Sequence, residues 1–229
     1  MGEERRFQLY GRRTGRALRP AQAKLLAEHL PRLRIDLAPG GTLDPASLFS
    51  ERSSDVWLEI GFGAGEHLVT QARANPSVGF IGAEPFRNGV AKLVSTLVAE
   101  DVANVRILDD DARPLIRALA PATLGRVFLL FPDPWPKVRH SRRRFVDADN
   151  LDALHRILRP GGELRIASDM PDYVRWTLVA VRRHGGFAWQ AKEPADWRTR
   201  PVDAPPTRYE LKALKSGRVP TYLSFVRLA

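Results

Sequence analysis

One stretch decides the fold: Val127-Phe-Leu-Leu-Phe-Pro-Asp-Pro-Trp-Pro-Lys-Val-Arg-His-Ser-Arg-Arg-Arg144. It begins with a continuous apolar run, which is the composition of a strand buried on both faces of a sheet. The prolines that follow cannot donate to the ladder, so the strand cannot continue through them. The chain must therefore leave the sheet at Phe131, and just beyond it presents one carboxylate, Asp133, between two prolines.

A basic segment comes directly after this carboxylate. Trp135 is followed by Lys137 and by the run from Arg139 to Arg144, in which no acidic residue occurs. Blocks of like charge repel unless a partner neutralises them. A fixed carboxylate beside an aromatic ring and a basic loop suits a nucleobase with its phosphates behind it. The alternative for a proline-rich turn is a strand end followed by a solvated loop.

The composition favours an anionic partner. The chain has 229 residues, enough to bury one substantial core, and a net charge of +10. Such a charge indicates a nucleic acid, and the lack of a long apolar segment argues against a membrane span. The N-terminal residues lack the apolar core of a secretory signal, so a cytoplasmic protein is expected.

The sequence contains no cysteine. It therefore cannot form a disulfide framework, a thiolate zinc site or a cysteine nucleophile, and no metal is expected. Attack on a pyrimidine ring by a thiolate is excluded as well. Any chemistry on a base should then use a nucleophile that the substrate itself supplies.

Strands and helices alternate from Asp55 onward with short connections. This order predicts a parallel sheet with helices on both faces, in which ligands lie at the carboxyl ends of the strands. A helix around Leu154 closes at Arg159-Pro-Gly-Gly162, and Asp169 stands just past the strand that follows. The expected strands are 56–60, 78–83, 105–108, 126–131, 163–167 and 222–228, and the other expected helices begin near 66, 87, 113 and 173.

Three segments are expected along the chain. Residues 1–20 are rich in arginine and short of apolar periodicity, which is typical of a mobile arm that orders on a polyanion. Residues 21–54 hold an amphipathic helix, ended by Pro31, and a connecting loop. Residues 55–229 form the sheet domain. The arginines of the arm are Arg5, Arg6, Arg12, Arg13, Arg16 and Arg19.

A glycine-rich turn follows the first strand. It reads Gly61-Phe-Gly63-Ala-Gly65, where glycines let the backbone turn sharply and approach a ligand closely. Glu66 stands where the dinucleotide fingerprint has its third glycine, and no Gly-Lys-Ser/Thr is present, which weakens the NAD and P-loop interpretations. A cofactor with a positive sulfonium and no phosphate tolerates nearby carboxylates such as Glu59. S-adenosylmethionine has those properties.

Two further carboxylates follow later strands in the same register. Glu84, at the end of the second strand, is placed to bind two ribose hydroxyls with its two oxygens. Asp111, after the third strand, is placed to hold the adenine edge. Together with the glycines they form a set that is more specific than any one of its members.

Five motifs carry a resemblance to a known family: Leu58-Glu-Ile-Gly-Phe-Gly-Ala-Gly65, Phe131-Pro-Asp-Pro-Trp-Pro-Lys137, Arg139-His-Ser-Arg-Arg-Arg144, Ser168-Asp169 and Pro206-Thr-Arg-Tyr-Glu210. With them the chain from about Tyr10 resembles the bacterial tRNA (guanine-N7)-methyltransferases. The resemblance implies a Rossmann-like class I methyltransferase fold, a seven-stranded, mostly parallel α/β sheet with an antiparallel last strand. It also implies S-adenosylmethionine as cofactor and N7 of guanine 46, in the variable loop of tRNA, as the methyl acceptor.

The resemblance assigns roles to individual residues. Those of the cofactor site are Glu59, Gly61, Gly63, Gly65, Glu84, Asp111 and Asp133. Those expected to meet the substrate are Lys137, Asp169, Thr207, Arg208, Tyr209 and Glu210. Those expected to touch RNA are Arg139, His140, Ser141, Arg142, Arg143 and Arg144. The chain departs from the family after Glu210, where Leu-Lys-Ala-Leu-Lys replaces a run rich in glutamine and glycine. The resemblance therefore does not assign the residues that form the C-terminal edge of the pocket.

Methyl transfer to N7 of guanine needs positioning rather than a base, because N7 carries a lone pair and no proton. The ring becomes cationic as the methyl arrives. A carboxylate on the N1–H and exocyclic amine edge would identify guanine and stabilise that charge, which is the catalytic role expected of Asp133 or Asp169. Trp135 either stacks on the base or packs beneath the loop.

Two other functions stay open. A methyltransferase of another RNA would use the same residues, whereas one of a small amine or a protein would leave the arginines unexplained. A non-catalytic RNA-binding protein on this fold would leave the intact carboxylates of the cofactor site without a purpose. Cofactor binding measured with and without tRNA separates these interpretations. tRNA is the expected partner, and the chain is expected to be a monomer or a homodimer.

Overall fold

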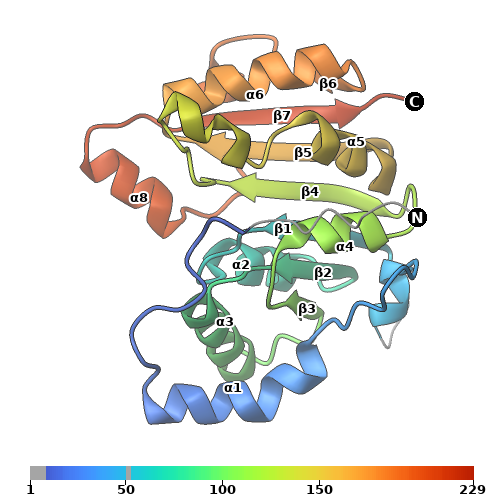
Figure 1. The fold of residues 1–229 in the computed structure, drawn as a ribbon, viewed down its shortest axis with the longest axis vertical. Coiled ribbons are helices and arrows are strands. Elements are labelled where there is room, and N and C mark those ends of the chain that lie inside the picture. Colours follow the sequence, from blue (N-terminus) through green and yellow to red (C-terminus); the bar gives the residue numbers. More distant parts are fainter. Residues whose placement is uncertain (1–8, 50–52) are drawn as a thin grey trace.

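The computed structural model describes residues 9–49 and 53–229, which form a seven-stranded sheet with helices on both faces (Figure 1). The strand order is β3-β2-β1-β4-β5-β7-β6. Among these strands β7 is antiparallel to both of its neighbours, and its arrow points against that of β4 in Figure 1. The expected, mostly parallel sheet with an antiparallel last strand is confirmed. The strands are β1 (Asp55–Ile60), β2 (Val78–Ala83), β3 (Val105–Leu108), β4 (Leu124–Leu130), β5 (Leu158–Ser168), β6 (Phe187–Trp189) and β7 (Thr221–Arg227).

Helices cover the sheet in two groups, one on each face. Side chains alternate along a strand, so Phe80 of β2 packs on one face with Leu93, while its neighbour Ile81 packs on the other with Leu115. The first face carries α1 to α3 and the second carries α4 to α6. The helices are α1 (Pro20–Leu33), α2 (Glu66–Ala74), α3 (Arg87–Ala99), α4 (Ala112–Ala118), α5 (Ala148–Ile157), α6 (Pro171–His184), α7 (Ala195–Arg198) and α8 (Arg208–Lys215), with short 3-10 turns η1 (Pro45–Leu48) and η2 (Val138–Arg143).

The apolar run from Val127 to Phe131 forms the middle of the sheet. Val127, Phe128 and Leu129 of β4 are all buried, and each side chain that leaves water stabilises the fold by about 1.5–3 kcal/mol. The N–H of Phe131 donates to the carbonyl of Ala167 at 2.8 Å, and the ladder then ends. The expected exit of the chain at this residue is confirmed, and it places the loop that follows at the carboxyl ends of the strands.

Two predicted boundaries are wrong, both because a long-range contact supports the backbone. Helix α1 does not end at Pro31 but continues to Leu33, whose side chain is buried in the core, so packing holds the last turn despite the missing N–H. Strand β5 begins at Leu158 rather than Glu163, with a shift of register against β4. There the Arg159 guanidinium binds both oxygens of Asp55 at 2.9 Å, which ties the irregular start of β5 to β1.

Residues 9–19 of the N-terminal segment, which was expected to be a mobile arm, contact the sheet domain. The carbonyl of Arg13 accepts the N–H of Arg87 at 2.9 Å, and the N–H of Gly15 donates to the Asn88 side chain at 2.9 Å. The first N–H groups of a helix have no partner within it, so the start of α3 offers donors to the segment without any polyanion. Arg5 and Arg6 lie outside the described residues.

Residues 20–49 also pack on the sheet domain rather than forming a unit of their own. Helix α1 lies against α3, and Ile35, which is 1% exposed, donates its N–H to the carbonyl of Ile107 at 2.8 Å. In the described ranges, no helix is long and apolar enough to cross a membrane. The same residues show no group of three or more His, Asp or Glu side chains that could hold a metal ion.

Candidate active site

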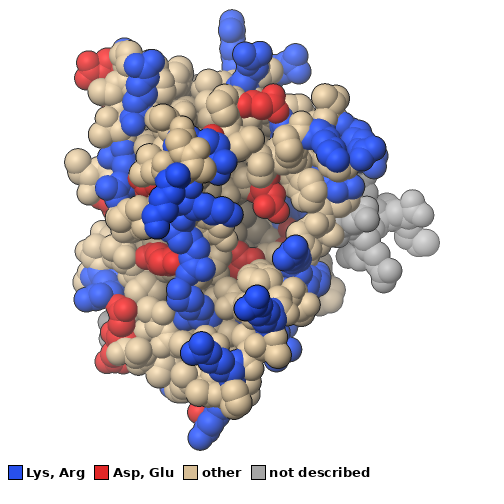
Figure 2. Space-filling model, turned by 90° about the vertical axis from the view of Figure 1, so that its left-hand side faces the viewer, with Lys and Arg blue, Asp and Glu red and all other residues tan. Residues whose placement is uncertain are grey.

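A cleft of about 630 Å³ opens at the carboxyl ends of β1, β2 and β4. Its volume is in the range of sites for small ligands, about 300–1,000 Å³. Glu84, Asp111 and Asp133, three of the predicted carboxylates, line it. Figure 2 looks onto this face and shows acidic side chains in a hollow with Lys and Arg side chains around it. The cleft therefore combines acidic walls with basic surroundings.

The glycine turn brings backbone to the cleft. Gly61, Gly63 and Gly65 have φ angles of 73°, 60° and 82°, a region that favours glycine. Gly61 and Gly63 line the cleft. Gly65 instead caps α2, and a Cβ on it would lie 2.5 Å from the Leu93 side chain. The predicted close approach to a ligand is thus available at the first two glycines, whereas the third packs the turn against α3.

Glu84 holds this turn in place. One of its oxygens accepts the N–H of Gly63 at 2.8 Å and the other accepts the N–H of Phe86 at 2.9 Å. Each oxygen keeps a lone pair for a further donor, as binding of two ribose hydroxyls requires. The side chain is 8% exposed, and this burial raises the pKa of Glu84 above its ordinary value, with the nearby charge of Asp133 acting in the same direction.

Asp111 begins α4 and has an arginine neighbour that sequence reasoning missed. Its carboxylate accepts the backbone N–H of Arg113 at 2.9 Å, as an N-cap does, and also pairs with the Arg113 guanidinium. Both residues line the cleft. The Asp-x-Arg spacing at a helix start is the signal in the sequence that could have indicated the pair.

The loop that carries Asp133 is strained. Phe131 and Trp135, on either side of it, have φ angles of 50° and 41°, which cost a non-glycine residue on the order of 1–3 kcal/mol each. Such a conformation persists only where the surroundings support it. Asp133 itself is exposed at the cleft, and none of the described residues donates a hydrogen bond to it.

Arg144 supplies that support from inside the protein. Its guanidinium donates to the carbonyls of Pro134 at 3.0 Å and Trp135 at 3.3 Å, and it forms an ion pair with Asp172 of α6. It lies 5.0 Å from the centre of the Trp176 ring and its residue is 5% exposed. A guanidinium that is buried and bonded in this way is not available to a phosphate. These contacts favour a role of Arg144 in holding the loop over the expected contact with RNA.

Trp135 belongs to an aromatic group at the cleft wall. Its ring meets those of Tyr10 and His140 edge to face, with centroid distances of 6.1 Å and 5.8 Å. The Arg143 guanidinium lies 4.5 Å from the centre of the Tyr10 ring and 4.9 Å from that of Trp135. Trp135 thus packs within the loop while also lining the cleft. The contact with Tyr10 was missed because residues 9–19 were expected to be mobile.

The segment from Thr207 to Glu210 divides between two roles. The Thr207 hydroxyl accepts the N–H of Glu210 at 3.2 Å and the Glu210 carboxylate accepts the N–H of Thr207 at 3.4 Å, a capping box that starts α8. Tyr222 also donates its O–H to Glu210 at 2.6 Å. Both capping residues are buried and neither lines the cleft, so their hydrogen bonds serve the start of α8.

Tyr209 is the member of this segment that reaches the cleft. A Cβ on Gly63 would lie 3.1 Å from its ring, so the tyrosine packs directly on the glycine turn. Arg208 beside it binds Glu66 of α2 at 2.6 Å. The Thr-x-x-Glu spacing was the sequence signal for α8, a helix that the expected order of elements did not contain.

Two other predicted carboxylates point away from the cleft. Glu59 is 4% exposed, with its Oε2 2.7 Å from Nδ1 of His67, beneath the glycine turn. Asp169 accepts the Nε–H of Arg218 at 2.6 Å. Neither lines the cleft: Glu59 is held by His67 of α2, and Asp169 lies beside Arg218, past the C-terminal end of α8.

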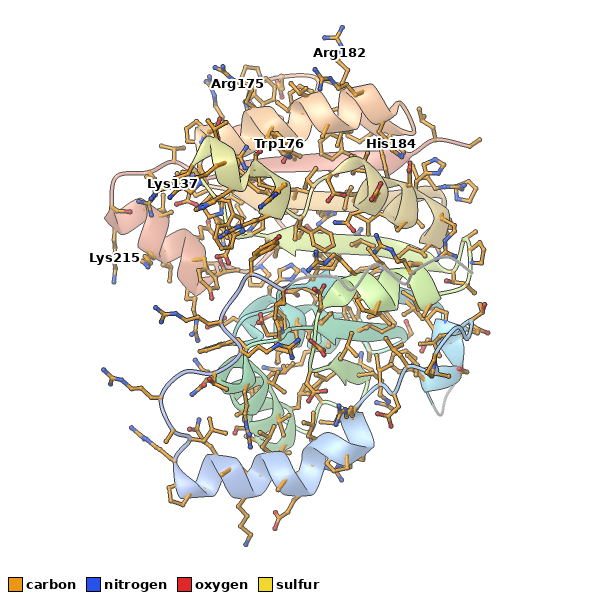
Figure 3. All side chains as sticks on the ribbon, viewed as in Figure 1. Lys137, Arg175, Trp176, Arg182, His184 and Lys215 are labelled. Carbon is orange, nitrogen blue, oxygen red and sulfur yellow. The ribbon has the colours of Figure 1, made fainter. Side chains whose placement is uncertain are left out.

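The basic loop, residues 137–142, stands beside the cleft. Lys137, Arg139 and Arg142 are exposed, and none of the described residues forms an ion pair with them. Figure 3 shows Lys137 on the side of the molecule where the parallel strands end. His140 packs on Trp135, and Ser141 lies within η2, so the three long cations are the charged groups of this loop that face solvent. Further residues that line the cleft and were not expected there are Arg12, Phe86 and Asn150.

Comparison with solved structures supports the fold. The chain is similar to the 16S rRNA methyltransferase KamB, with a TM-score of 0.57 and 18% identity over 77% of this chain and 89% of that one. It is also similar to an rRNA methylase from Streptococcus thermophilus, with a TM-score of 0.52 and 12% identity over 94% of this chain and 100% of that one. At such identities the likeness concerns the fold alone.

Comparison of sequences adds information on the family to that on the fold. A family model described as "Putative methyltransferase" matches residues 53–222. The chain is 51% identical to a tRNA (guanine-N(7)-)-methyltransferase of Mesorhizobium japonicum over 95% of this chain and 94% of that one, and 51% identical to one of Rhodospirillum rubrum over 98% and 89%. With one of Agrobacterium fabrum it shares 46% identity over 99% of this chain and 100% of that one. The chain therefore belongs to the tRNA (guanine-N(7)-)-methyltransferase family.

Proposed function

We propose that the protein transfers the methyl group of S-adenosylmethionine to N7 of a guanine in tRNA, namely guanine 46 of the variable loop. The observation that carries the proposal is one cleft lined by both the exposed carboxylate of Asp133 and the buried carboxylate of Glu84, beside a basic loop. The reaction named for the relatives requires both halves of such a site, one for a cationic cofactor and one for a base of a polyanion.

The residues present fit the cofactor. Glu84 and Asp111 would repel a pyrophosphate but attract a positive sulfonium, and the glycine turn brings backbone to the cleft at Gly61 and Gly63. S-adenosylmethionine, when bound, supplies a methyl group on a positively charged sulfur. Glu84 would accept the ribose hydroxyls with the lone pairs that its two backbone donors leave free. Asp111 would hold the adenine edge.

Asp133 is the residue that would bind the guanine base. Of the two carboxylates that the sequence left open for this role, Asp169 is already bound by Arg218, whereas Asp133 has no donor among the described residues and lies in the cleft. Its oxygens would accept the N1–H and the exocyclic amine of guanine. Adenine offers no such pair of donors and is refused. Residues 131–135, held by Arg144, fix the carboxylate before the base arrives.

The step needs no general base. The N7 lone pair forms the new bond to the methyl carbon as the carbon–sulfur bond breaks and its electron pair stays on sulfur, so no proton moves. The positive charge passes from sulfur to the purine ring. A carboxylate fixed beside that ring stabilises the transition state, an effect typically worth about 10²–10³ in rate for one contact.

The experiment that tests the proposal is incubation with labelled S-adenosylmethionine and unmodified tRNA, followed by mapping of the methylated nucleotide. The expected product is 7-methylguanosine at position 46. A matched tRNA in which this guanine is replaced by adenine should accept no label. Methylation of another nucleotide would move the proposal to a different RNA site, and label on protein or small amines would overturn it.

A further inference from the structure

Helix α8 carries two exposed lysines that the structure leaves unused. Lys212 and Lys215 lie in its last turn, and no acidic partner for them occurs among the described residues. The arginines near the two ends of the helix differ from these lysines, because each has an acidic partner. Arg208 binds Glu66 at 2.6 Å and Arg218 binds Asp169 at 2.6 Å. Isolated cations on a surface are usually only solvated, so their position relative to the cleft decides whether they have a further role.

The helix that carries them stands on the other side of the cleft from the basic loop, and its Tyr209 forms part of the cleft wall. Tyr209 and Arg208 of α8 pack on the glycine turn and on α2, which covers the first face of the sheet. The basic loop leads instead to Arg144, which binds Asp172 of α6 on the second face. The two basic elements therefore flank the carboxyl ends of the strands from both faces. Figure 3 shows Lys137 and Lys215 on this same side of the molecule.

The helix is also held as a fixed support. Glu210 and Ala213 face inward and are buried, and the capping box, Tyr222 and the two arginine ion pairs fix the element at its start, middle and end. Its outer surface presents Leu211 and Leu214, which are 49% and 51% exposed, beside the lysines. Such a surface loses little conformational entropy when a ligand binds, because the backbone is already ordered.

We infer that α8 is a second contact surface for the RNA backbone, with Lys212 and Lys215 neutralising phosphates across the cleft from the basic loop. The inference rests on the proposed function. A strand that crosses from the basic loop to α8 would pass over the acidic cleft, where repulsion of phosphates keeps the backbone at the edges and leaves the base to enter. Leu211 and Leu214 would then lie against sugar rather than against a phosphate.

The test is the salt dependence of tRNA binding by the variant Lys212→Gln/Lys215→Gln. Glutamine removes the charge and keeps a similar helix propensity, so α8 should still form. Loss of two phosphate contacts should weaken binding and reduce the slope of log K against log salt by about 1.4–1.8. The affinity for S-adenosylmethionine, measured by calorimetry, should not change.

The matched control is Arg182→Gln/Arg183→Gln. These two cations also lie in the last turn of a helix, α6, and no ion-pair partner for them occurs in the described part of the chain. Arg182 points away from the cleft at the far end of the molecule (Figure 3). This variant loses the same net charge but should keep the wild-type slope. A slope reduced as much as in the α8 variant would show that the loss of net charge alone explains the weaker binding.

The outcomes separate the inference from the proposed function. If the wild type binds tRNA and the α8 variant keeps its slope, the inference is overturned and the proposed function stands. If the wild type neither binds nor methylates tRNA, both fall. If sedimentation shows a dimer that Leu211→Ser/Leu214→Ser dissociates while tRNA affinity stays unchanged, α8 is an interface between copies of the chain and the inference is again overturned.

Discussion

Five carboxylates near the cleft differ in the partners that already occupy them. Glu59 and Asp169 are bound by His67 and Arg218 and point elsewhere. Glu84 and Asp111 each hold backbone N–H groups yet still face the cleft. Asp133 faces the cleft with no donor among the described residues. In the proposed reaction the same chemical group would therefore serve as a support, a cofactor ligand or a ligand for the base, depending on its neighbours.

Asp133→Asn is expected to reduce methyl transfer by about two to four orders of magnitude, because it keeps the shape but presents a donor to the donors of guanine. Single-turnover rates with labelled cofactor measure the effect, and calorimetry should show unchanged cofactor affinity. The wild-type rate should be flat between about pH 6 and pH 8, since N7 has no proton to lose. A rate that rises tenfold per pH unit would show that a proton is removed and would exclude N7 as the acceptor.

Glu84 should make the stability of the protein depend on pH in a direction opposite to that of most carboxylates. Burial raises its pKa in the folded state above the ordinary value of 4.5, so between the two values the folded state binds more protons than the unfolded state. Stability from this group is then present at low pH and declines as the pH rises through the folded-state pKa.

The variant Glu84→Gln isolates this contribution. The free energy of unfolding of the wild type minus that of the variant should fall as the pH rises from 4.5 toward neutral. Urea unfolding at several pH values measures the difference, and a Glu100→Gln variant, changed at an exposed position, serves as the control. A difference that grows with pH would mean that the folded structure favours the charged form of Glu84.

At the scale of elements, the site depends on the contacts that hold the loop of residues 131–135 and helix α8 in position. The loop of residues 131–135 contains two strained positions, and a buried arginine from the end of η2 joins it to α6. Helix α8 starts with a capping box that places Tyr209 on Gly63. In both cases a residue that resembles a ligand in the sequence holds a neighbouring residue in position instead.

Arg144→Lys tests this arrangement. Lysine keeps the charge but lacks the planar fork, so it cannot serve two carbonyls and Asp172 together. The loss should cost about 1.5–3 kcal/mol of unfolding free energy in urea titrations. The rate of methyl transfer should fall with it, because Asp133 is no longer fixed. The matched variant Arg142→Lys, at an exposed position, should keep wild-type stability. Unchanged stability in Arg144→Lys, with a reduced salt slope of tRNA binding, would return this residue to the RNA surface.

At the scale of the whole molecule, charge is distributed unevenly. The net charge is +10, yet the cleft is lined by carboxylates and the cations stand around it, as Figure 2 shows. Such a field attracts a polyanion from a distance while keeping its phosphates off the acidic walls. The same distribution admits a cationic cofactor. One pattern of charge therefore suits both substrates of the proposed reaction.

Neutralising the basic loop should weaken this attraction without affecting the cofactor. In Arg139→Gln/Arg142→Gln, tRNA binding is expected to weaken and the slope of log K against log salt to fall by roughly one unit per lost contact. Filter binding at several salt concentrations measures the slope, and calorimetry gives the cofactor affinity. A slope equal to that of the wild type would show that these exposed arginines are only solvated.

Much of the fold could be predicted because its determinants are local. An apolar run stopped by prolines defines β4, a glycine turn joins β1 to α2, and alternating periodicities order the parallel sheet. The positions of Glu84, Asp111 and Asp133 follow from the same rule, since groups just past parallel strands meet at one edge of the sheet. These parts of the site were determined by the sequence alone.

Only the tertiary structure decided which polar groups remain for a ligand. Arg144 is one of four arginines in a six-residue run, and nothing in that run distinguishes it from its exposed neighbours. Its burial depends on carbonyls nine and ten residues earlier and on a carboxylate 28 residues later. The attachment of residues 9–19 to Asn88, and the pairing of Glu59 with His67, likewise depend on contacts across the fold. Periodicity shows which face of an element is buried, but the pairing of a polar group depends on distances that exist only once distant segments have packed together.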